Sequence, residues 1–162
     1  MSPTRREVLT QLAALAGLPL AMRVRTGQDP LDGTIAEYQA GRRRGDWSAV
    51  EVTARALDRC RADGARWRAI DLLSPTALDE ARAADARLKN GRVRGPLDGV
   101  PVFAKAIYDM RGLPTTGSSA EWARLFPEPV RRDALEVARL RAAGAIVLGK
   151  TAADDFAYHG NG

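Results

Sequence analysis

The chain has 162 residues, of which 45% are hydrophobic and 28% are charged, so it is long enough for one globular domain with a buried core. Its net charge is +5, but its only tight basic run, Arg42, Arg43 and Arg44, indicates a solvated helix end, and we expect no nucleic-acid partner. A single cysteine, Cys60, and a single histidine, His159, argue against a disulfide framework, a metal site and a Ser-His-Asp triad. We expect no metal and no cofactor.

The first 25 residues are typical of an export signal. Arg5 and Arg6 precede an apolar stretch over residues 8–22, and a charged start before an apolar middle is typical of signal peptides. The paired arginines resemble a twin-arginine signal. The stretch is too short to span a bilayer comfortably, so we expect no stable membrane span. Use of this signal implies an exported, periplasmic protein; the alternative is an ordinary amphipathic helix on a cytoplasmic chain.

Two helices are expected next. Residues 34–44 should form a short helix, and Ser48 with Glu51 is a capping box that begins a second helix, running to about Ala62. Helical spacing predicts three apolar residues on the inner face of this second helix: Val50, Ala54 and Leu57.

A strand and a helix follow. Residues 67–73 are rich in apolar side chains and are expected to form a strand. Ser74 and Pro75 then favour a helix start, because serine caps well and proline at the first helical position loses no hydrogen bond. The predicted helix, residues 75–89, ends at Asn90-Gly91.

The apolar run over residues 100–107 predicts a strand that contains Lys105. Gly117-Ser118-Ser119 could suggest a reactive serine loop. We interpret Ser118 with Glu121 instead as the capping box of a helix that contains Trp122 and Leu125, and we assign neither serine as a nucleophile.

The last part of the chain continues the alternation of helices and strands. Asp133 is expected to cap a helix over residues 133–143, residues 145–148 should form a short buried strand, and Thr151 should open another helix. Strands that alternate with helices predict an α/β layer architecture for the chain after residue 30.

Residues 144–151, GAIVLGKT, match the phosphate-loop pattern GxxxxGK[ST]. A phosphate loop needs a flexible segment whose N–H groups surround a phosphate. Here the four middle residues favour a strand, so nucleotide binding through Gly149, Lys150 and Thr151 is kept only as a third, disfavoured interpretation.

Several motifs occur together in the order and spacing of one family. Residues 95–101 (GPLDGVP) precede Lys105, residues 112–118 (GLPTTGS) follow it, and residues 137–151 supply a helix, a strand and a turn. Over residues 30–162 the chain resembles the N-terminal part of the amidase signature family. The resemblance implies an α/β/α fold with a mixed sheet, of which this chain would form an incomplete N-terminal part.

Lys105 falls on the catalytic lysine of that family. The resemblance implies hydrolysis of a carboxylic amide by a Ser-Ser-Lys triad, with Lys105 as the general base. Since lysine acts as a base only when neutral and burial favours the neutral amine, we expect Lys105 to be buried in its apolar strand. The alternative is a strand-end lysine whose ammonium reaches water. Family members commonly have an aspartate after this lysine, where this chain has Ala106.

The family's bridging and nucleophilic serines lie downstream in a Gly/Ser-rich loop, and both are absent from this chain. Residues 159–162 resemble the approach to that loop. We therefore expect a truncated amidase that is inactive by itself and whose completed form acts on a small-molecule amide. The alternative is a non-catalytic interaction fragment that complements a separately encoded C-terminal part.

Overall fold

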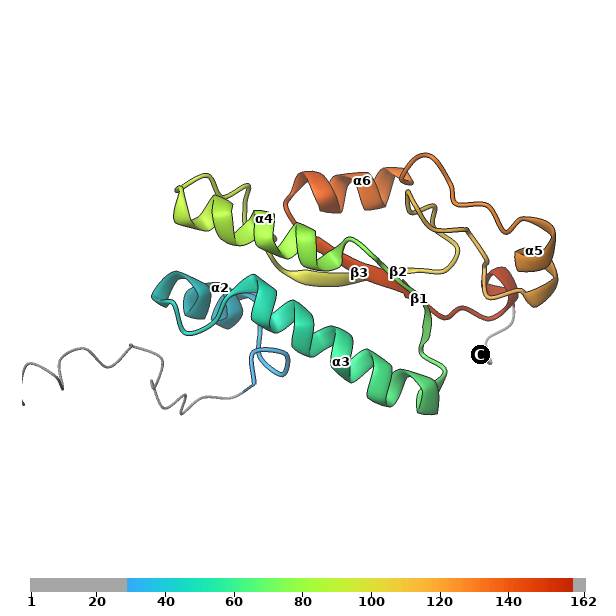
Figure 1. Ribbon diagram of the computed structural model, residues 1–162, viewed down its shortest axis with the longest axis horizontal. Coiled ribbons are helices and arrows are strands. Elements are labelled where there is room, and N and C mark those ends of the chain that lie inside the picture. Colours follow the sequence, from blue (N-terminus) through green and yellow to red (C-terminus); the bar gives the residue numbers. More distant parts are fainter. Residues whose placement is uncertain (1–28, 159–162) are drawn as a thin grey trace, which may run out of the picture.

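The computed structural model describes residues 29–158 (Figure 1). The predicted signal peptide, residues 1–25, and the predicted loop approach, residues 159–162, lie outside the described residues. The described elements, in chain order, are α2 (Ile35–Arg44), α3 (Ala49–Trp67), β1 (Ile70–Leu73), α4 (Ala77–Lys89), β2 (Pro101–Lys105), α5 (Ala120–Leu125), α6 (Leu135–Ala142), β3 (Ile146–Thr151) and the 3-10 helix η1 (Asp155–Ala157). None of the helices in this part of the chain is long and apolar enough to cross a membrane.

The three strands form one mixed sheet in the order β1-β3-β2. The central strand β3 is antiparallel to β1 and parallel to β2, and five of its six residues are buried. A parallel pair needs a crossover connection, and here α5 and α6 lie between β2 and β3 in the chain. The predicted mixed α/β architecture is therefore confirmed.

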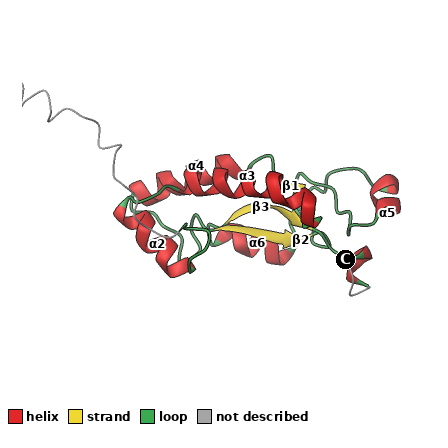
Figure 2. Ribbon diagram, turned by 90° about the horizontal axis from the view of Figure 1, so that it is seen from below, coloured by secondary structure: helices red, strands yellow, loops and turns green. Residues whose placement is uncertain are grey.

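Helices cover both faces of this sheet, which gives an α/β/α arrangement. Small and aliphatic side chains of α3 and α4 pack on Ile146 and Leu148 of β3, and Val137 of α6 packs with Val147 and Ala104 on a second core. Figure 2 shows α3 and α4 on one side of the sheet and α6 on the other. Because alternate residues of a strand point to opposite faces, β3 supplies apolar side chains to both cores.

The predicted start of α3 is confirmed in detail. The Ser48 hydroxyl accepts from the Glu51 N–H, and the Glu51 carboxylate accepts from the Ser48 N–H, so the capping box is complete. Helix α3 extends five residues past the predicted end at Ala62. Its buried face differs from the prediction: Val50 and Ala54 are half-buried, and the fully buried residues include Ala49, Val52, Thr53, Ala56 and Leu57.

Strand β1 and helix α4 begin later than predicted. Because α3 continues to Trp67 and ends with Arg68 in a left-handed conformation, β1 is limited to its last four predicted residues. The N-cap of α4 is Thr76, not Ser74; the Ser74 hydroxyl accepts from the Thr76 N–H at 3.3 Å and so forms a turn before the helix. The predicted end at Asn90-Gly91 is confirmed.

Three predicted caps are wrong because tertiary partners occupy them. Asp133 accepts from the Arg111 N–H at 2.7 Å and pairs with Arg141, so α6 begins at Leu135 without a side-chain cap. The Ser118 hydroxyl accepts from the N–H of Ala153 at 2.8 Å, and α5 begins after Ser119 instead. At the end of the chain Thr151 belongs to β3, and only the short η1 follows.

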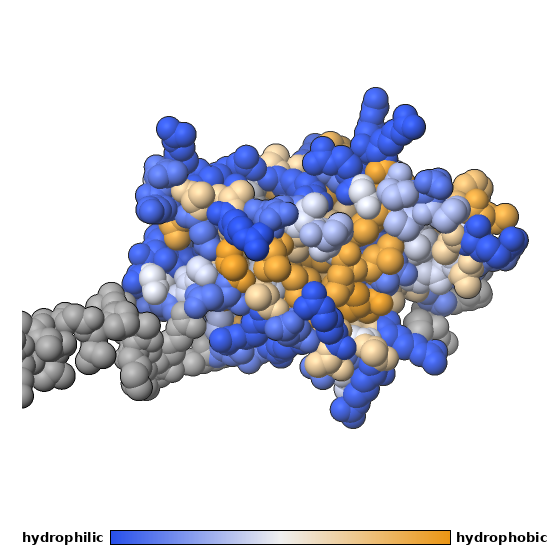
Figure 3. Space-filling view, in the orientation of Figure 1, coloured by the Kyte–Doolittle hydropathy of each residue, from blue (hydrophilic) through white to orange (hydrophobic). Residues whose placement is uncertain are grey.

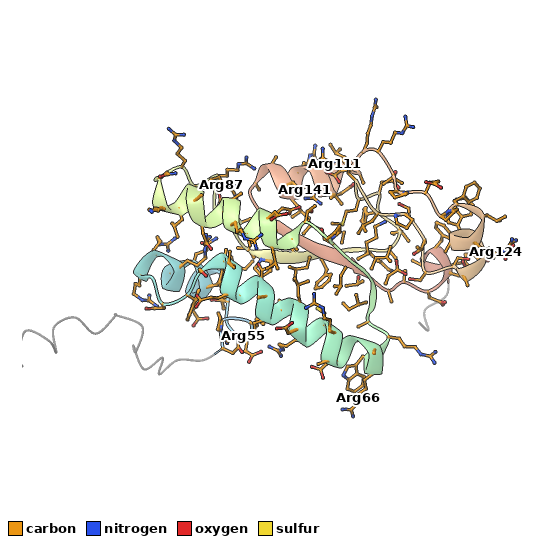
Figure 4. All side chains as sticks on the ribbon, in the orientation of Figure 1. Arg55, Arg66, Arg87, Arg111, Arg124 and Arg141 are labelled. Carbon is orange, nitrogen blue, oxygen red and sulfur yellow. The ribbon has the colours of Figure 1, made fainter. Side chains whose placement is uncertain are left out.

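The turn before β2, residues 95–99, is held by helices α2 and α4. Tyr38 donates to the carbonyl of Gly99 at 2.7 Å, and Gln39 and Arg42 donate to the carbonyl of Asp98. From α4, Arg87, which is labelled in Figure 4, donates to the carboxylate of Asp98 with bonds of 2.8 and 2.9 Å. These contacts fix the start of β2, and therefore the position of the lysine at its end.

Candidate functional site

The predicted catalytic lysine, Lys105, is the last residue of β2. It lies opposite Thr151 in the parallel pair with β3. Its side chain is exposed, and among residues 29–158 it has no hydrogen-bond or ion-pair partner. The expected burial of Lys105 is thus wrong for this chain. Alternate side chains of a strand point to opposite sides, and here the neighbours Ala104 and Ala106 are the buried ones.

A turn follows Lys105 directly. The N–H of Tyr108 donates to the carbonyl of Lys105 at 3.0 Å, and the N–H of Ala106 donates to the carbonyl of Thr151 at 2.9 Å. Ala106 is fully buried, and its carbonyl accepts from the N–H of Gly117 at 3.3 Å. The position where the family commonly has an aspartate is therefore packed and held by backbone bonds.

The segment over residues 114–118, which we call the 114–118 loop, lies beside this turn. Lys150 of β3 fixes one end of it: its ammonium donates to the carbonyl of Pro114 at 2.6 Å and to the hydroxyl of Thr115 at 3.2 Å. Lys150 is 0% exposed. Burial lowers its pKa, and the negative charges of Asp71 and Asp109 oppose that shift. The buried lysine that ends an apolar run is therefore Lys150, not Lys105.

Asp71 of β1 holds the other end of the 114–118 loop. Its carboxylate accepts from the Thr116 hydroxyl at 2.7 Å and lies 3.5 Å from the Ser118 hydroxyl. Ser118 has a φ of 59°, a left-handed conformation that is uncommon for serine. Its hydroxyl oxygen accepts from the N–H of Ala153, which gives this hydroxyl a structural role.

These contacts bring together residues from all three strands at one end of the sheet. Lys105 and Lys150 come from the carboxyl ends of parallel strands, where ligand sites of open α/β sheets gather. At this end Lys105 offers an ammonium that has no partner among residues 29–158. It lies beside the 114–118 loop, which hydrogen bonds from Lys150 and to Asp71 hold in place. Sequence reasoning missed Asp71 and the role of Lys150; the run AIVLGKT contained the same signal for Lys150, an apolar strand leading into a lysine.

The phosphate-loop interpretation does not fit this geometry. Gly144 follows the end of α6, residues 146–151 form β3, and the Lys150 ammonium donates to protein oxygens inside the core. The N–H groups that would surround a phosphate belong to a strand paired on both sides. In the described part of the chain, no group of three His, Cys, Asp or Glu side chains is placed to hold a metal ion.

Comparison with known proteins gives the same family in sequence and in structure. The family model described as Amidase matches residues 51–162. A glutamyl-tRNA(Gln) amidotransferase subunit from Salinispora arenicola is 46% identical over 115 residues, which cover 70% of this chain and 23% of that protein. An amidase of Pseudomonas putida is 38% identical over 126 residues, 77% of this chain and 26% of that protein.

The structural similarity extends over the same region. The crystal structure of native peptide amidase from Stenotrophomonas maltophilia superposes with a TM-score of 0.70 at 35% identity, covering 76% of this chain and 26% of that one. The chain thus spans about a quarter of the length of the proteins it matches.

Proposed function

Since this chain belongs to the Amidase family, we propose that it supplies the lysine of an amide-hydrolysing site, with Lys105 as the general base. The observation that supports this role is the position of Lys105: it ends β2 at the edge where strands β2 and β3 finish, and its ammonium has no partner among residues 29–158. In the proposed reaction the neutral amine takes a proton from a bridging serine, which in turn activates a nucleophilic serine.

The proposal requires a further polypeptide segment over Lys105. Lysine acts as a base only in its neutral form, and Lys105 lies exposed in this structure. A segment that contributes both serines would also cover Lys105, and the loss of water would favour its neutral form. The chain alone should therefore be inactive, and the completed protein should hydrolyse a carboxylic amide.

The decisive experiment begins by sequencing the DNA through and beyond codon 162 in all three frames. A Gly/Ser-rich segment with two serines identifies the remainder, and the joined product is tested for release of ammonia from simple and amino-acid amides. Lys105→Ala in that product should abolish hydrolysis while circular dichroism stays unchanged. Lys89→Ala is the matched control, because Lys89 is also exposed but ends α4. Normal turnover with Lys105→Ala would rule out the role.

We propose that the substrate is a small-molecule amide. Several relatives are named as subunits of a glutamyl-tRNA(Gln) amidotransferase. Export through the predicted signal would separate this protein from cytoplasmic tRNA, which favours a small substrate, and periplasmic localisation follows from the same signal.

A second candidate function is that of an interaction fragment. The outer edges of β1 and β2 are unpaired within the described sheet, and unpaired strand edges are sites where another strand can add. An apolar area also lies near the middle of the face shown in Figure 3, and exposed apolar areas mark sites of protein interaction. A separately expressed C-terminal remainder should then bind this chain in a pull-down. Failure to bind, with activity only in the covalently joined product, would exclude this candidate.

A further inference from the structure

A small cavity opens beside α5. Its volume is about 240 Å³. It is lined by three aromatic rings, two carboxylates and one hydroxyl, which belong to Trp122, Phe126, Phe156, Asp109, Glu128 and Thr115. The volume lies below the roughly 300–1,000 Å³ of sites for drug-sized ligands, so it suits a small group or the end of a longer molecule.

The three aromatic rings form one connected cluster. The ring of Trp122 lies 4.3 Å from that of Phe126, and it meets the ring of Phe156 edge-on at 5.2 Å. All three side chains remain about half exposed, at 40%, 52% and 42%. Ring surface that stays open to solvent beside a cavity can receive a ligand, and a cation over an aromatic face is attracted by the quadrupole of the ring.

The position of Phe156 is maintained at a cost in backbone energy. Its φ of 52° lies in the left-handed region, which a bulky residue rarely adopts. The N–H of Phe156 donates to the carbonyl of Gly117 at 2.9 Å, and its ring packs where a side chain at Gly117 would stand. Strained residues of this kind cluster at ligand sites, where the surroundings hold them in place.

The side chains that carry charge around the cavity are acidic. Asp109 accepts from the Thr115 hydroxyl at 2.6 Å, and the same hydroxyl accepts from the buried Lys150 ammonium. Glu128 is exposed, and neither Glu128 nor Asp109 has an ion-pair partner among residues 29–158. On α5 the neighbouring Glu121 is already paired with Arg124, which points outward from α5 (Figure 4). Among residues 29–158 the cavity therefore offers Glu128 without an ion-pair partner and Asp109, whose charge acts on the nearby buried Lys150, beside open aromatic faces.

We propose that this cavity binds a small organic cation, an alkylammonium group, between the rings and the carboxylates. The rings would supply cation–π attraction and apolar contact, and Glu128 and Asp109 would balance the charge. This inference concerns binding and does not depend on the amidase reaction. Taken together with the proposed function, it favours amides that carry an ammonium group, since Asp109 and Thr115 belong to the segments that follow Lys105.

The test titrates the 162-residue chain with choline and with 3,3-dimethylbutan-1-ol, which has the same shape without the charge. Binding is measured by isothermal titration calorimetry and by tryptophan fluorescence. Choline should bind about tenfold more tightly than the alcohol, the range expected for cation–π contacts with partly desolvated rings. Equal binding of the two probes, or no binding of choline at millimolar concentration, would overturn the proposal.

Matched variants locate the site. Trp122→Leu should abolish choline binding, whereas Trp67→Leu should not, because Trp67 is 68% exposed at the end of α3. Glu128→Gln should weaken choline binding several-fold and leave the alcohol unaffected; Glu121→Gln, on α5, should change neither. Since Glu128 is exposed, its substitution is not expected to unfold the chain. Unchanged choline affinity in Glu128→Gln would refute the assigned role of the carboxylate.

Discussion

Replacement of Asp98 by asparagine should destabilise the protein strongly. The Asp98 side chain is 1% exposed, and it accepts two bonds from the Arg87 guanidinium and one, at 2.8 Å, from the N–H of Arg94. An asparagine keeps one acceptor oxygen and turns an NH2 group toward these donors, so it loses charge-assisted bonds and leaves Arg87 unpaired. Breaking a buried pair costs about 3–5 kcal/mol. Because Arg87 is 19% exposed and keeps some hydration, we expect about 3 kcal/mol.

The assay is urea unfolding of the 162-residue chain, followed by circular dichroism. With an m value of about 2 kcal/mol/M, a loss of about 3 kcal/mol lowers the urea midpoint by about 1.5 M. Asp58→Asn is the control, because Asp58 forms an exposed pair with Arg61, 75% and 62% exposed, and should cost less than about 1 kcal/mol. If the two variants unfold at the same urea concentration, the Asp98 network contributes no more than a surface pair.

The same pair sets a dependence on pH. Burial raises the pKa of Asp98, but the bonds from Arg87 and Arg94 and the charges of Arg87 and Arg42 outweigh it, so the pKa lies below its ordinary value. A carboxyl with a lowered pKa stabilises the fold above its unfolded-state pKa and loses this contribution as the pH falls through its folded-state pKa. The difference in unfolding free energy between wild type and Asp98→Asn should therefore shrink below about pH 4.

The remaining predictions test the central strand and the export signal. Gly149→Ala should lower the free energy of unfolding by about 3 kcal/mol, because the new Cβ would overlap the β1 backbone. Gly91→Ala has open space and should lower it by only about 1 kcal/mol, because of its positive φ. The urea midpoints of the two variants measure this difference. Burial disfavours the charged form of Lys150 and so lowers its pKa in the folded protein. The free energy of unfolding of the wild type should therefore rise relative to that of Lys150→Met as the pH rises toward 10. A constant difference between the two free energies of unfolding from about pH 7 to 10 would contradict this. Changing both Arg5 and Arg6 to lysine should stop export of a reporter fused to residues 1–30, as measured by cell fractionation; export of the variant at the wild-type level would exclude the twin-arginine interpretation.

The sequence alone determined the features that depend on near neighbours. The Ser48–Glu51 capping box joins residues three positions apart, and its two bonds form wherever the chain turns into a helix. The end of α4 at Asn90-Gly91 is local in the same way. The alternation of helices and strands was also readable, because each element has its own apolar period. These features were sufficient for the α/β class, whereas the family resemblance depended on the motifs at residues 95–101, 112–118 and 137–151.

Only the tertiary structure decided which polar side chains are buried and with what partners. Lys105 and Lys150 both follow apolar runs, so the sequence near each lysine gives the same signal. Only Lys150 is buried, because its ammonium donates to the 114–118 loop. Asp133 and Ser118 look like caps, but backbone N–H groups 22 and 35 residues away occupy their oxygens. Local hydrogen bonds depend on residues adjacent in the chain, whereas burial depends on segments that meet only after the sheet has formed.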